Sequence, residues 1–289
     1  MKLGILGGTF NPIHLGHITI ATEVKSLFNL DSILFIPAKS PPLKETGSHF
    51  SDSFRYKLVE AAIKEQDCFQ VSDIESQREG PSYTVRTLKE VLTQTKIMPQ
   101  DLYFVLGIDG FYDIKLWNSY RELFNLANFI IVTRAGVETD LQKIITIAQE
   151  LGFCYNGDIE GTVNFCDFKE KKYGTENESS EKSSQSETTG VSNAYALPET
   201  PNTNKNSENF QICRSLILQG HHNISKQGNL PRMLKNFYNN SDLHIFLVEV
   251  SPIDISSTDI RNRLNDGRSI EDLVPRAVHN LIKEEYTTT

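Results

Sequence analysis

The sequence has 289 residues, of which 38% are hydrophobic and 23% charged, so it can bury the core of one large or two small domains. Its net charge of −8 and isoelectric point near 5.4 argue against a surface that coats nucleic acid. We expect a cytoplasmic protein with free thiols, because no run reaches the ~18 apolar residues of a membrane span, no secretory signal is evident, and the four cysteines lack short paired spacing.

The first predicted elements are a strand at residues 3–6 and a helix whose apolar residues recur at helical spacing from Ile20 to Phe28. Between them, residues 7–17 read Gly-Gly-Thr-Phe-Asn-Pro-Ile-His-Leu-Gly-His. Glycines let backbone N–H groups approach a ligand closely, and the start of a helix offers N–H donors and partial positive charge, which suits a phosphate. His14 and His17 can add donors to an anion that the backbone already holds.

This turn matches neither of two common nucleotide-binding loops. No Gly-Lys-Ser/Thr follows its glycines, and it does not fit Gly-x-Gly-x-x-Gly, so a dinucleotide fold of the hydride-transfer kind is not expected. Two other interpretations stay open. His14 and His17 could be a metal pair, although the first strand and turn contain no Cys or carboxylate to complete a zinc set, or they could be solvated side chains of a purely structural turn.

Further strands and helices alternate along the chain. Short apolar runs predict strands at 33–36, 69–71, 102–106 and 128–133. Helical spacing predicts a helix that starts near Ser51 or Ser53 and buries Phe54, Leu58, Ala61 and Ala62, a second that follows residues 80–84 with Ser or Thr as its cap, and a third at 141–151.

This alternation predicts a parallel, doubly wound, Rossmann-like sheet with right-handed crossovers. Ligands of such sheets bind beyond the carboxyl ends of the strands. Several polar features lie at such ends: the turn at 7–17, the loop at 38–50 with Lys39 and Lys44, the Gly-Pro-Ser-Tyr-Thr stretch at 80–84, the Gly-Ile-Asp-Gly turn at 107–110, and Arg134. We therefore expect one ligand site at this edge of the sheet.

A long detour at about residues 152–242 precedes a last core strand at 243–250. Within it, residues 170–209 are rich in Glu, Lys, Ser, Thr and Asn and cannot bury enough apolar area to offset the entropy of ordering. We expect this stretch to be a disordered or solvated insertion, and a role as an interaction segment stays open. After the strand, Ser256 or Ser257 is expected to cap a helix that reaches Leu264, and a helical region follows at 270–286.

Two segments carry a resemblance to a known family. Residues 8–12, Gly-Thr-Phe-Asn-Pro, followed by His14-x-x-His17, resemble the (T/H)xGH signature of nucleotidyltransferases. Residues 255–261, Ile-Ser-Ser-Thr-Asp-Ile-Arg, resemble the second signature of the adenylyltransferases in that superfamily. Together, at the two ends of an α/β chain, they resemble the bacterial nicotinate-nucleotide adenylyltransferases. The resemblance implies a nucleotidyltransferase domain built from 1–151 and 243–289, with a connection at 152–242 that is much shorter in the family.

The resemblance also implies a reaction. A member of this family transfers AMP from ATP to nicotinate mononucleotide in NAD biosynthesis, giving deamido-NAD and pyrophosphate by in-line attack without a covalent intermediate, with Mg²⁺ accompanying ATP. The same chemistry on nicotinamide mononucleotide or phosphopantetheine is one alternative. A nucleotide-binding regulator that has lost catalysis is another. No nucleic-acid or membrane partner is expected, and whether the chain forms a homo-oligomer is left open.

The reaction requires donors and cations that hold two anionic reactants in line. For ATP, we expect the backbone N–H groups of Gly8, Thr9 and Phe10 to hold phosphate oxygens, and His14 and His17 to donate to the α- and β-phosphates. Ser257 and Thr258 stand at a helix start, where N–H groups and hydroxyls can bind the β- and γ-phosphates. Arg261 returns to the same face one turn later and adds a fixed charge, the alternative being a solvated helix charge. The predicted catalytic residues are His14, His17 and Arg261.

The acceptor side follows from the resemblance alone. Tyr83, Thr84 and Trp117 map to residues that meet the pyridine ring and its carboxylate, and Asp109 to one that contacts ribose hydroxyls. Arg134 and Lys44 map near the acceptor phosphate and the triphosphate. Two positions depart from the family pattern: Leu43 stands where the family often has His, and Ile108 where small residues are common.

Overall fold

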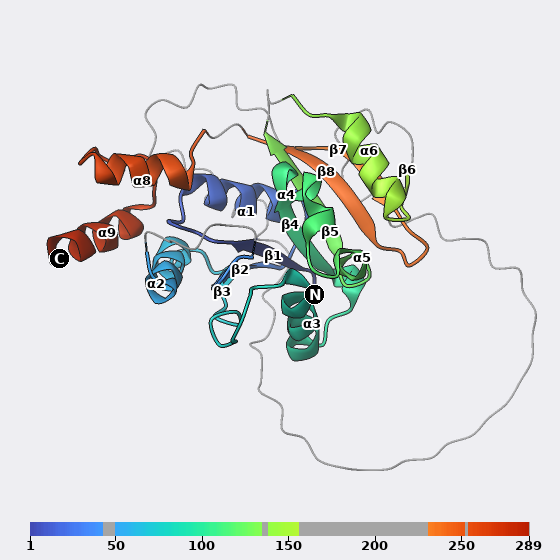
Figure 1. The fold of residues 1–289 in the computed structure, drawn as a ribbon, viewed down its shortest axis with the longest axis horizontal. Helices are drawn as coiled ribbons and strands as arrows, with labels where there is room; N and C mark the ends of the chain where they lie inside the picture. The colour runs from blue at the N-terminus through green and yellow to red at the C-terminus, as the bar shows by residue number, and fades with distance from the viewer. Residues whose placement is uncertain (43–49, 135–137, 156–230, 252–253, 289) are drawn as a thin grey trace, which may run out of the picture.

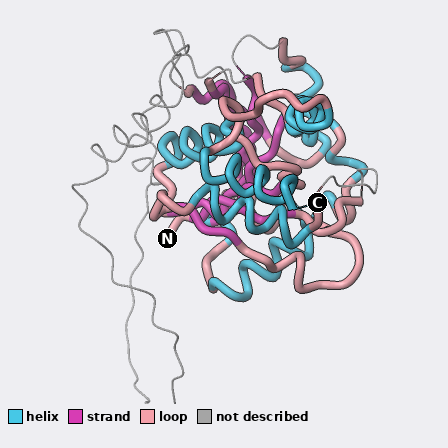
Figure 2. The backbone as a smooth tube through the Cα atoms, turned by 90° about the vertical axis from the view of Figure 1, so that its left-hand side faces the viewer, coloured by secondary structure: helices cyan, strands magenta, loops and turns pink. Residues whose placement is uncertain are grey.

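The computed structural model describes residues 1–42, 50–134, 138–155, 231–251 and 254–288, and these form an eight-stranded sheet with helices on both faces (Figures 1 and 2). The strand order is β3-β2-β1-β4-β5-β8-β7-β6. The strands are β1 (Leu3–Gly8), β2 (Ser32–Pro37), β3 (Phe69–Val71), β4 (Leu102–Gly107), β5 (Asn128–Arg134), β6 (Cys154–Tyr155), β7 (Arg232–Tyr238) and β8 (His244–Val250). The predicted Rossmann-like sheet is confirmed for the strands β3-β2-β1-β4-β5-β8, which are all parallel. The strands β7 and β6 add an antiparallel edge next to β8.

Alternating apolar residues explain why the sheet is covered on both faces. In β4, Tyr103 and Val105 belong to one core cluster, while Phe104 and Leu106 belong to the other. The same alternation recurs in β5 and β8, because successive side chains of a strand point to opposite faces. Strands that are buried on both faces read as nearly continuous apolar runs, which is why the sequence located them well.

The helices divide between the two faces (Figure 1). One face is packed by α1 (Leu15–Phe28), α2 (Asp52–Ile63), α8 (Ser257–Asn265) and α9 (Arg276–Thr288). The other is packed by α3 (Thr84–Thr95), α4 (Ile108–Tyr112), α5 (Tyr120–Leu123) and α6 (Leu141–Glu150), with the short 3₁₀ turns η1 (Pro99–Asp101) and η2 (Ile114–Leu116) between them. None of the helices in the described ranges is long and apolar enough to cross a bilayer.

The order of the strands fixes where a ligand can bind. The chain runs outward from β1 through β2 to β3 and then crosses back to β4 on the other side of β1. In such a sheet, the crevice lies at this switch point, beyond the carboxyl ends of the strands. The turn after β1 and the turn after β4 both open at that point, and both contain residues that the sequence singled out.

One prediction of local structure, the Ser or Thr cap of the helix after residues 80–84, was wrong. The N-cap of α3 is Tyr83 and makes no side-chain cap bond, because the hydroxyl of Ser82 instead accepts a hydrogen bond from the backbone of Ser40 at 3.1 Å. In the glycine-flanked turn at 107–110, Gly107 is the N-cap of α4, which begins at Ile108 directly after β4.

The predicted insertion at 152–242 was drawn too broadly. Its two ends supply β6 and β7, and β7 pairs antiparallel with β8 along its length. Met233 and Phe237 of β7 are buried in opposite core clusters, so this strand belongs to the sheet. The low-complexity stretch at 170–209 and the lysine predicted at position 44 lie outside the described residues.

Candidate active site

The turn between β1 and α1 is held in an unusual backbone conformation. Phe10 has φ of +47°, and its ring is buried against His17 and Phe35 with centroid distances of 5.0 and 5.9 Å. A Cβ at Gly8 would lie 3.1 Å from the Phe10 ring, so a larger residue would push the buried ring by a few tenths of an ångström. Because positive φ is costly for a residue with a side chain, surrounding contacts must hold this turn in place.

Those contacts come from three other parts of the chain: the residue after β2, helix α2 and helix α8. Each of four carbonyl oxygens in the turn accepts a hydrogen bond: Gly8 from Ala38 N at 2.8 Å, Thr9 from Arg55 Nη1 at 2.5 Å, Asn11 from Arg261 Nη1 at 2.9 Å, and Pro12 from Ser257 Oγ at 2.9 Å. Within the ranges the structure describes, the backbone N–H groups of Thr9 and Phe10 have no acceptor. The turn is thus held by its carbonyls, and two of its amides remain as donors for a bound anion.

The two histidines contact each other at the start of α1. The backbone N–H of His14 donates to His17 Nδ1 at 3.2 Å, and the two rings lie 3.7 Å apart between centroids. His17 stands at the third position of the helix and takes the acceptor role that Glu or Gln fills in a capping box. Because Nδ1 of His17 accepts, a neutral ring carries its proton on Nε2 and can donate it to a ligand.

His14 is the more buried of the two. Burial of the ring, with a smaller contribution from the charge of Arg134, lowers the pKa of His14 to about 3. The ring is therefore neutral at physiological pH. Its Nδ1 is buried and has no hydrogen-bond partner among the described residues, which is a costly state for a polar atom unless a ligand supplies the partner.

We expect the burial of His14 to make the protein less stable in mild acid. The native-state pKa of about 3 lies below the ordinary histidine value of 6.5, so the unfolded state binds the proton first and protonation favours unfolding. The penalty is absent well above pH 6.5, grows as the pH falls below that value, and reaches about 2 kcal/mol at pH 5. Urea unfolding of the wild-type chain and of His14→Gln at pH 7, 6 and 5 measures it. Equal pH dependence in the two proteins would contradict this assignment.

The second signature packs directly on the first. Ser256 caps α8 by accepting from Asp259 N at 3.1 Å, as predicted for one of the two serines. Arg261, one turn into α8, bonds to Asn11 O and, through Nη2, to Thr258 Oγ1 at 3.1 Å. The segments near the two ends of the chain are therefore joined at one turn, and Arg261 is not a solvated helix charge.

One predicted role is changed by these contacts. The hydroxyl proton of Ser257 is donated to Pro12 O, so in this arrangement Ser257 joins the two signatures and has no hydroxyl proton left for a phosphate. Thr258 accepts from Arg261 and keeps its own proton for another acceptor. At the end of β5, Arg134 is exposed, lies 3.9 Å from Asp254, and is close enough to His14 to influence its pKa.

Part of the predicted acceptor set lies on the opposite face of the sheet from α1 and α8. Tyr83 and Trp117 are half-buried and pack against the same core cluster, and Trp117 meets Phe104 edge-on at 6.3 Å. Thr84 begins α3, and Asp109 stands exposed in the first turn of α4. A Cβ at Gly110 would lie 2.6 Å from the end of the Leu106 side chain, which would have to shift, and 3.7 Å from Trp117, which is an ordinary packing distance.

The loops that carry the acceptor residues are tied to one another. Ser82 N donates to Ser40 O at 2.9 Å, and Lys39 Nζ donates to the carbonyls of Ser76 and Arg78 at 3.0 and 2.8 Å. Lys39 therefore fixes the loop after β3, a use that the sequence did not indicate.

Arg55 and the side chain of Asn11 were also missed. In the structure Arg55 is 1% exposed. The apolar pattern had selected Phe54 and Ala61 for the buried face of this helix and did not include Arg55. Asn11 Oδ1 accepts from Phe50 N at 3.2 Å and links the turn to the segment before α2. The apolar spacing carries no signal for either contact.

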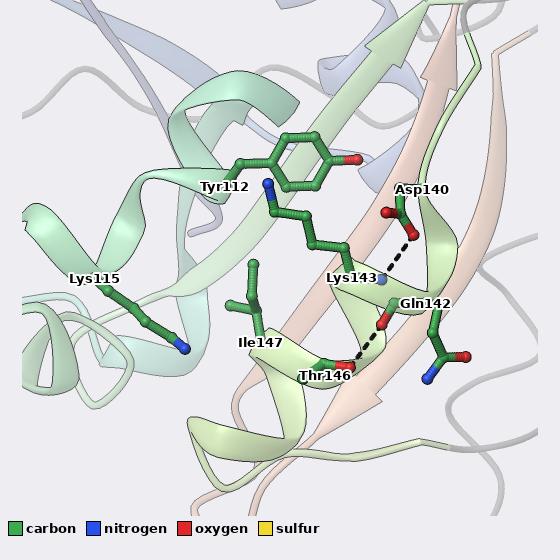
Figure 3. Close-up of a pocket in the computed structure, with 7 residues that line it drawn as sticks. All are labelled: Tyr112, Lys115, Asp140, Gln142, Lys143, Thr146 and Ile147. Carbon is green, nitrogen blue, oxygen red and sulfur yellow. Dashed lines mark hydrogen bonds between the residues drawn. The ribbon is translucent and has the colours of Figure 1, made fainter.

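A separate hollow of about 480 Å³ lies between α4, η2 and α6 (Figure 3). Its polar lining is engaged locally: Lys143 Nζ lies 4.1 Å from the Tyr112 ring centroid, and Asp140 accepts from Lys143 N at 2.9 Å. None of the predicted site residues lines it. This hollow is therefore distinct from the switch-point site.

The sheet is Rossmann-like and holds a histidine pair at its switch point, and a serine and an arginine from a C-terminal helix bond to the same turn. This combination defines the nucleotidyltransferase class of α/β proteins. A family model described as cytidylyltransferase-like matches residues 5–263. The chain belongs to the cytidylyltransferase-like family.

Relatives within this family carry a narrower name. A "probable nicotinate-nucleotide adenylyltransferase" of Geotalea daltonii is 41% identical over 157 residues, which cover 54% of this chain and 72% of the relative. One of the same name from Syntrophotalea carbinolica is 44% identical over 159 residues, covering 54% and 71%. A solved Plasmodium falciparum nicotinic acid mononucleotide adenylyltransferase, complexed with NaAD, aligns with a TM-score of 0.42 and 22% identity over 50% of this chain and 69% of that one.

Proposed function

We propose that the chain transfers AMP from ATP to nicotinate mononucleotide, giving deamido-NAD and pyrophosphate. One observation carries the proposal: Ser257 bonds to the carbonyl of Pro12 and Arg261 to that of Asn11, so both signatures meet at one turn, two of whose amides have no acceptor among the described residues. The names of the relatives support the choice of acceptor.

The proposed step is a direct displacement at phosphorus. A phosphate oxygen of nicotinate mononucleotide attacks the α-phosphorus of ATP, a new P–O bond forms, and the bond from that phosphorus to the oxygen bridging to the β-phosphorus breaks. The electron pair of the broken bond leaves with pyrophosphate. Because the nucleophile is already an anion, the site needs no strong base and has to align the reactants and stabilise charge.

The residues of the turn fit that requirement. The Thr9 and Phe10 amides and the Nε2 proton of His17 would donate to phosphate oxygens, and Arg261 would add a fixed positive charge beside them. A bound polyphosphate would raise the pKa of His14, because a nearby negative charge favours the protonated ring, in which both nitrogens are donors. Tyr83 and Trp117 would bind the pyridine ring of the acceptor, with Thr84, Asp109 and Arg134 as further contacts.

Mg²⁺ is proposed to enter with ATP. No group of three or more His, Cys, Asp and Glu side chains is arranged to hold a metal in the part of the chain that the structure describes. The triphosphate oxygens would therefore supply most of the ligands, as is usual for Mg²⁺. When bound, the ion would offset charge on the phosphates.

A cytoplasmic setting is proposed as well. Cys154, which lies within the described ranges, carries a free thiol, as is typical of proteins from a reducing compartment.

An acceptor panel tests the function. The purified full-length chain is supplied with MgATP and, separately, with nicotinate mononucleotide, nicotinamide mononucleotide and phosphopantetheine, and pyrophosphate release is measured. We expect release with nicotinate mononucleotide, accompanied by deamido-NAD in a mass spectrum. Preferred release with another acceptor would reassign the substrate. ATP binding with no release in any reaction would indicate a nucleotide-binding regulator instead.

A further inference from the structure

Arg55 is a buried cation behind the phosphate-binding turn. It lies on α2, is 1% exposed, and donates through Nη1 to Thr9 O at 2.5 Å. Its Nε has no hydrogen-bond partner, and no carboxylate forms an ion pair with it, among the residues that the structure describes. A buried charge that lacks a counterion is costly, so its retention here points to a role beyond packing.

The guanidinium remains charged despite its burial. Burial lowers the pKa of Arg55, while the nearby carboxylate of Asp52 raises it. Because arginine starts from a pKa far above neutrality, the side chain stays protonated under physiological conditions. The positive charge is therefore held permanently behind Thr9.

The geometry of the peptide unit connects this charge to the ligand side of the turn. The carbonyl of Thr9 and the N–H of Phe10 belong to one planar peptide bond, and in a trans peptide they point in opposite directions. The peptide bond between Asn11 and Pro12 is the cis one in the described chain, so the Thr9–Phe10 unit is trans. Holding the oxygen from behind therefore aims the Phe10 N–H forward, and the hydrogen bond to the oxygen also makes that N–H a stronger donor.

We propose that Arg55 is a positioning residue for the phosphates of ATP, which acts through the Thr9–Phe10 peptide by fixing and polarising the Phe10 N–H. The inference rests on the proposed function. It explains why Phe10 can hold a φ of +47° and why its amide faces no acceptor in the described chain. The anion bound in front of the turn would be the counterion that the buried guanidinium otherwise lacks.

The test compares Arg55→Met with Val59→Ala. Val59 lies one turn further along the same helix and is 0% exposed, so its truncation disturbs the same core without touching the turn. Inorganic tripolyphosphate is titrated into each full-length protein by calorimetry, and its effect on the Phe10 amide is followed by NMR. We expect Arg55→Met to bind tripolyphosphate about tenfold more weakly or worse, with a smaller shift of the Phe10 amide. Val59→Ala should keep the wild-type affinity and shift, although both variants unfold at lower temperature.

Arg55→Lys guards against a variant that fails to fold. Lysine keeps the buried charge but has a single ammonium in place of the planar fork, so we expect an affinity between those of wild type and Arg55→Met. Wild-type affinity in Arg55→Met, or in Arg55→Lys if only that protein folds, would overturn the inference, as would an equal loss in Val59→Ala. Such results with normal pyrophosphate release would leave the proposed function standing. A wild-type chain that neither binds tripolyphosphate nor releases pyrophosphate would remove both.

Discussion

Replacing His17 by alanine is expected to lower kcat about 100- to 1,000-fold, the range seen when one donor to a developing negative charge is removed. The affinity for ATP should change much less, because the Nε2 proton of His17 is proposed to bind the phosphates most strongly in the transition state. The fixed Nδ1 bond to His14 N supports this role, since it leaves the other ring nitrogen as the donor. Steady-state kinetics together with the dissociation constant of a non-hydrolysable ATP analogue separate the two effects.

The same substitution also removes a helix cap, and a control is needed for that loss. His17→Ala leaves the His14 N–H without its acceptor, which is expected to cost about 1 kcal/mol of stability. Rates are therefore measured at a temperature where thermal unfolding shows every variant to be folded. His279→Ala, on α9, replaces a half-buried histidine that takes no part in the proposed site and should leave kcat unchanged. Equal losses in ATP affinity and in rate for His17→Ala would argue against a transition-state role.

Local sequence patterns were sufficient to predict most of the sheet. The strands at 33–36, 102–106 and 128–133 were found because both of their faces are buried, so each appears as an unbroken apolar run. Turns at the carboxyl ends of those strands then follow from the doubly wound topology. This reasoning places the 7–17 turn and Asp109 at the same edge of the sheet.

Contacts that depend on the tertiary fold were out of reach. A charged residue in a helix is expected on the solvated face, so Arg55 gave no sign that it would be buried against Thr9 O. Ser257 was expected to serve the ligand, yet its hydroxyl is donated to Pro12 O, 245 residues away in sequence. Strand β7 was assigned to the insertion because it follows the low-complexity stretch in sequence, whereas its place in the sheet depends on pairing with β8.

Replacing Arg261 by methionine is expected to be as damaging as the loss of His17, but through a different balance of effects. Its guanidinium makes one bond to Asn11 O and one to Thr258 Oγ1, so methionine removes both a link between the two signatures and a fixed charge beside the phosphates. We expect kcat/KM for ATP to fall about 100-fold or more, with KM for ATP rising, because the charge would act on bound ATP as well as on the transition state.

Arg263, half a turn away on α8, provides a matched control. It pairs with Asp259 at 2.9 Å on the surface, an interaction worth a few tenths of a kcal/mol, so Arg263→Met should keep both rate and affinity. Arg261→Lys keeps the charge but cannot form both bonds in the planar geometry of the guanidinium, so its kcat/KM should lie between those of wild type and Arg261→Met. If Arg261→Met matched Arg263→Met in kcat/KM, the bonds from α8 to the Asn11–Pro12 turn would be structural only, and the site would have to work without a charge from the second signature.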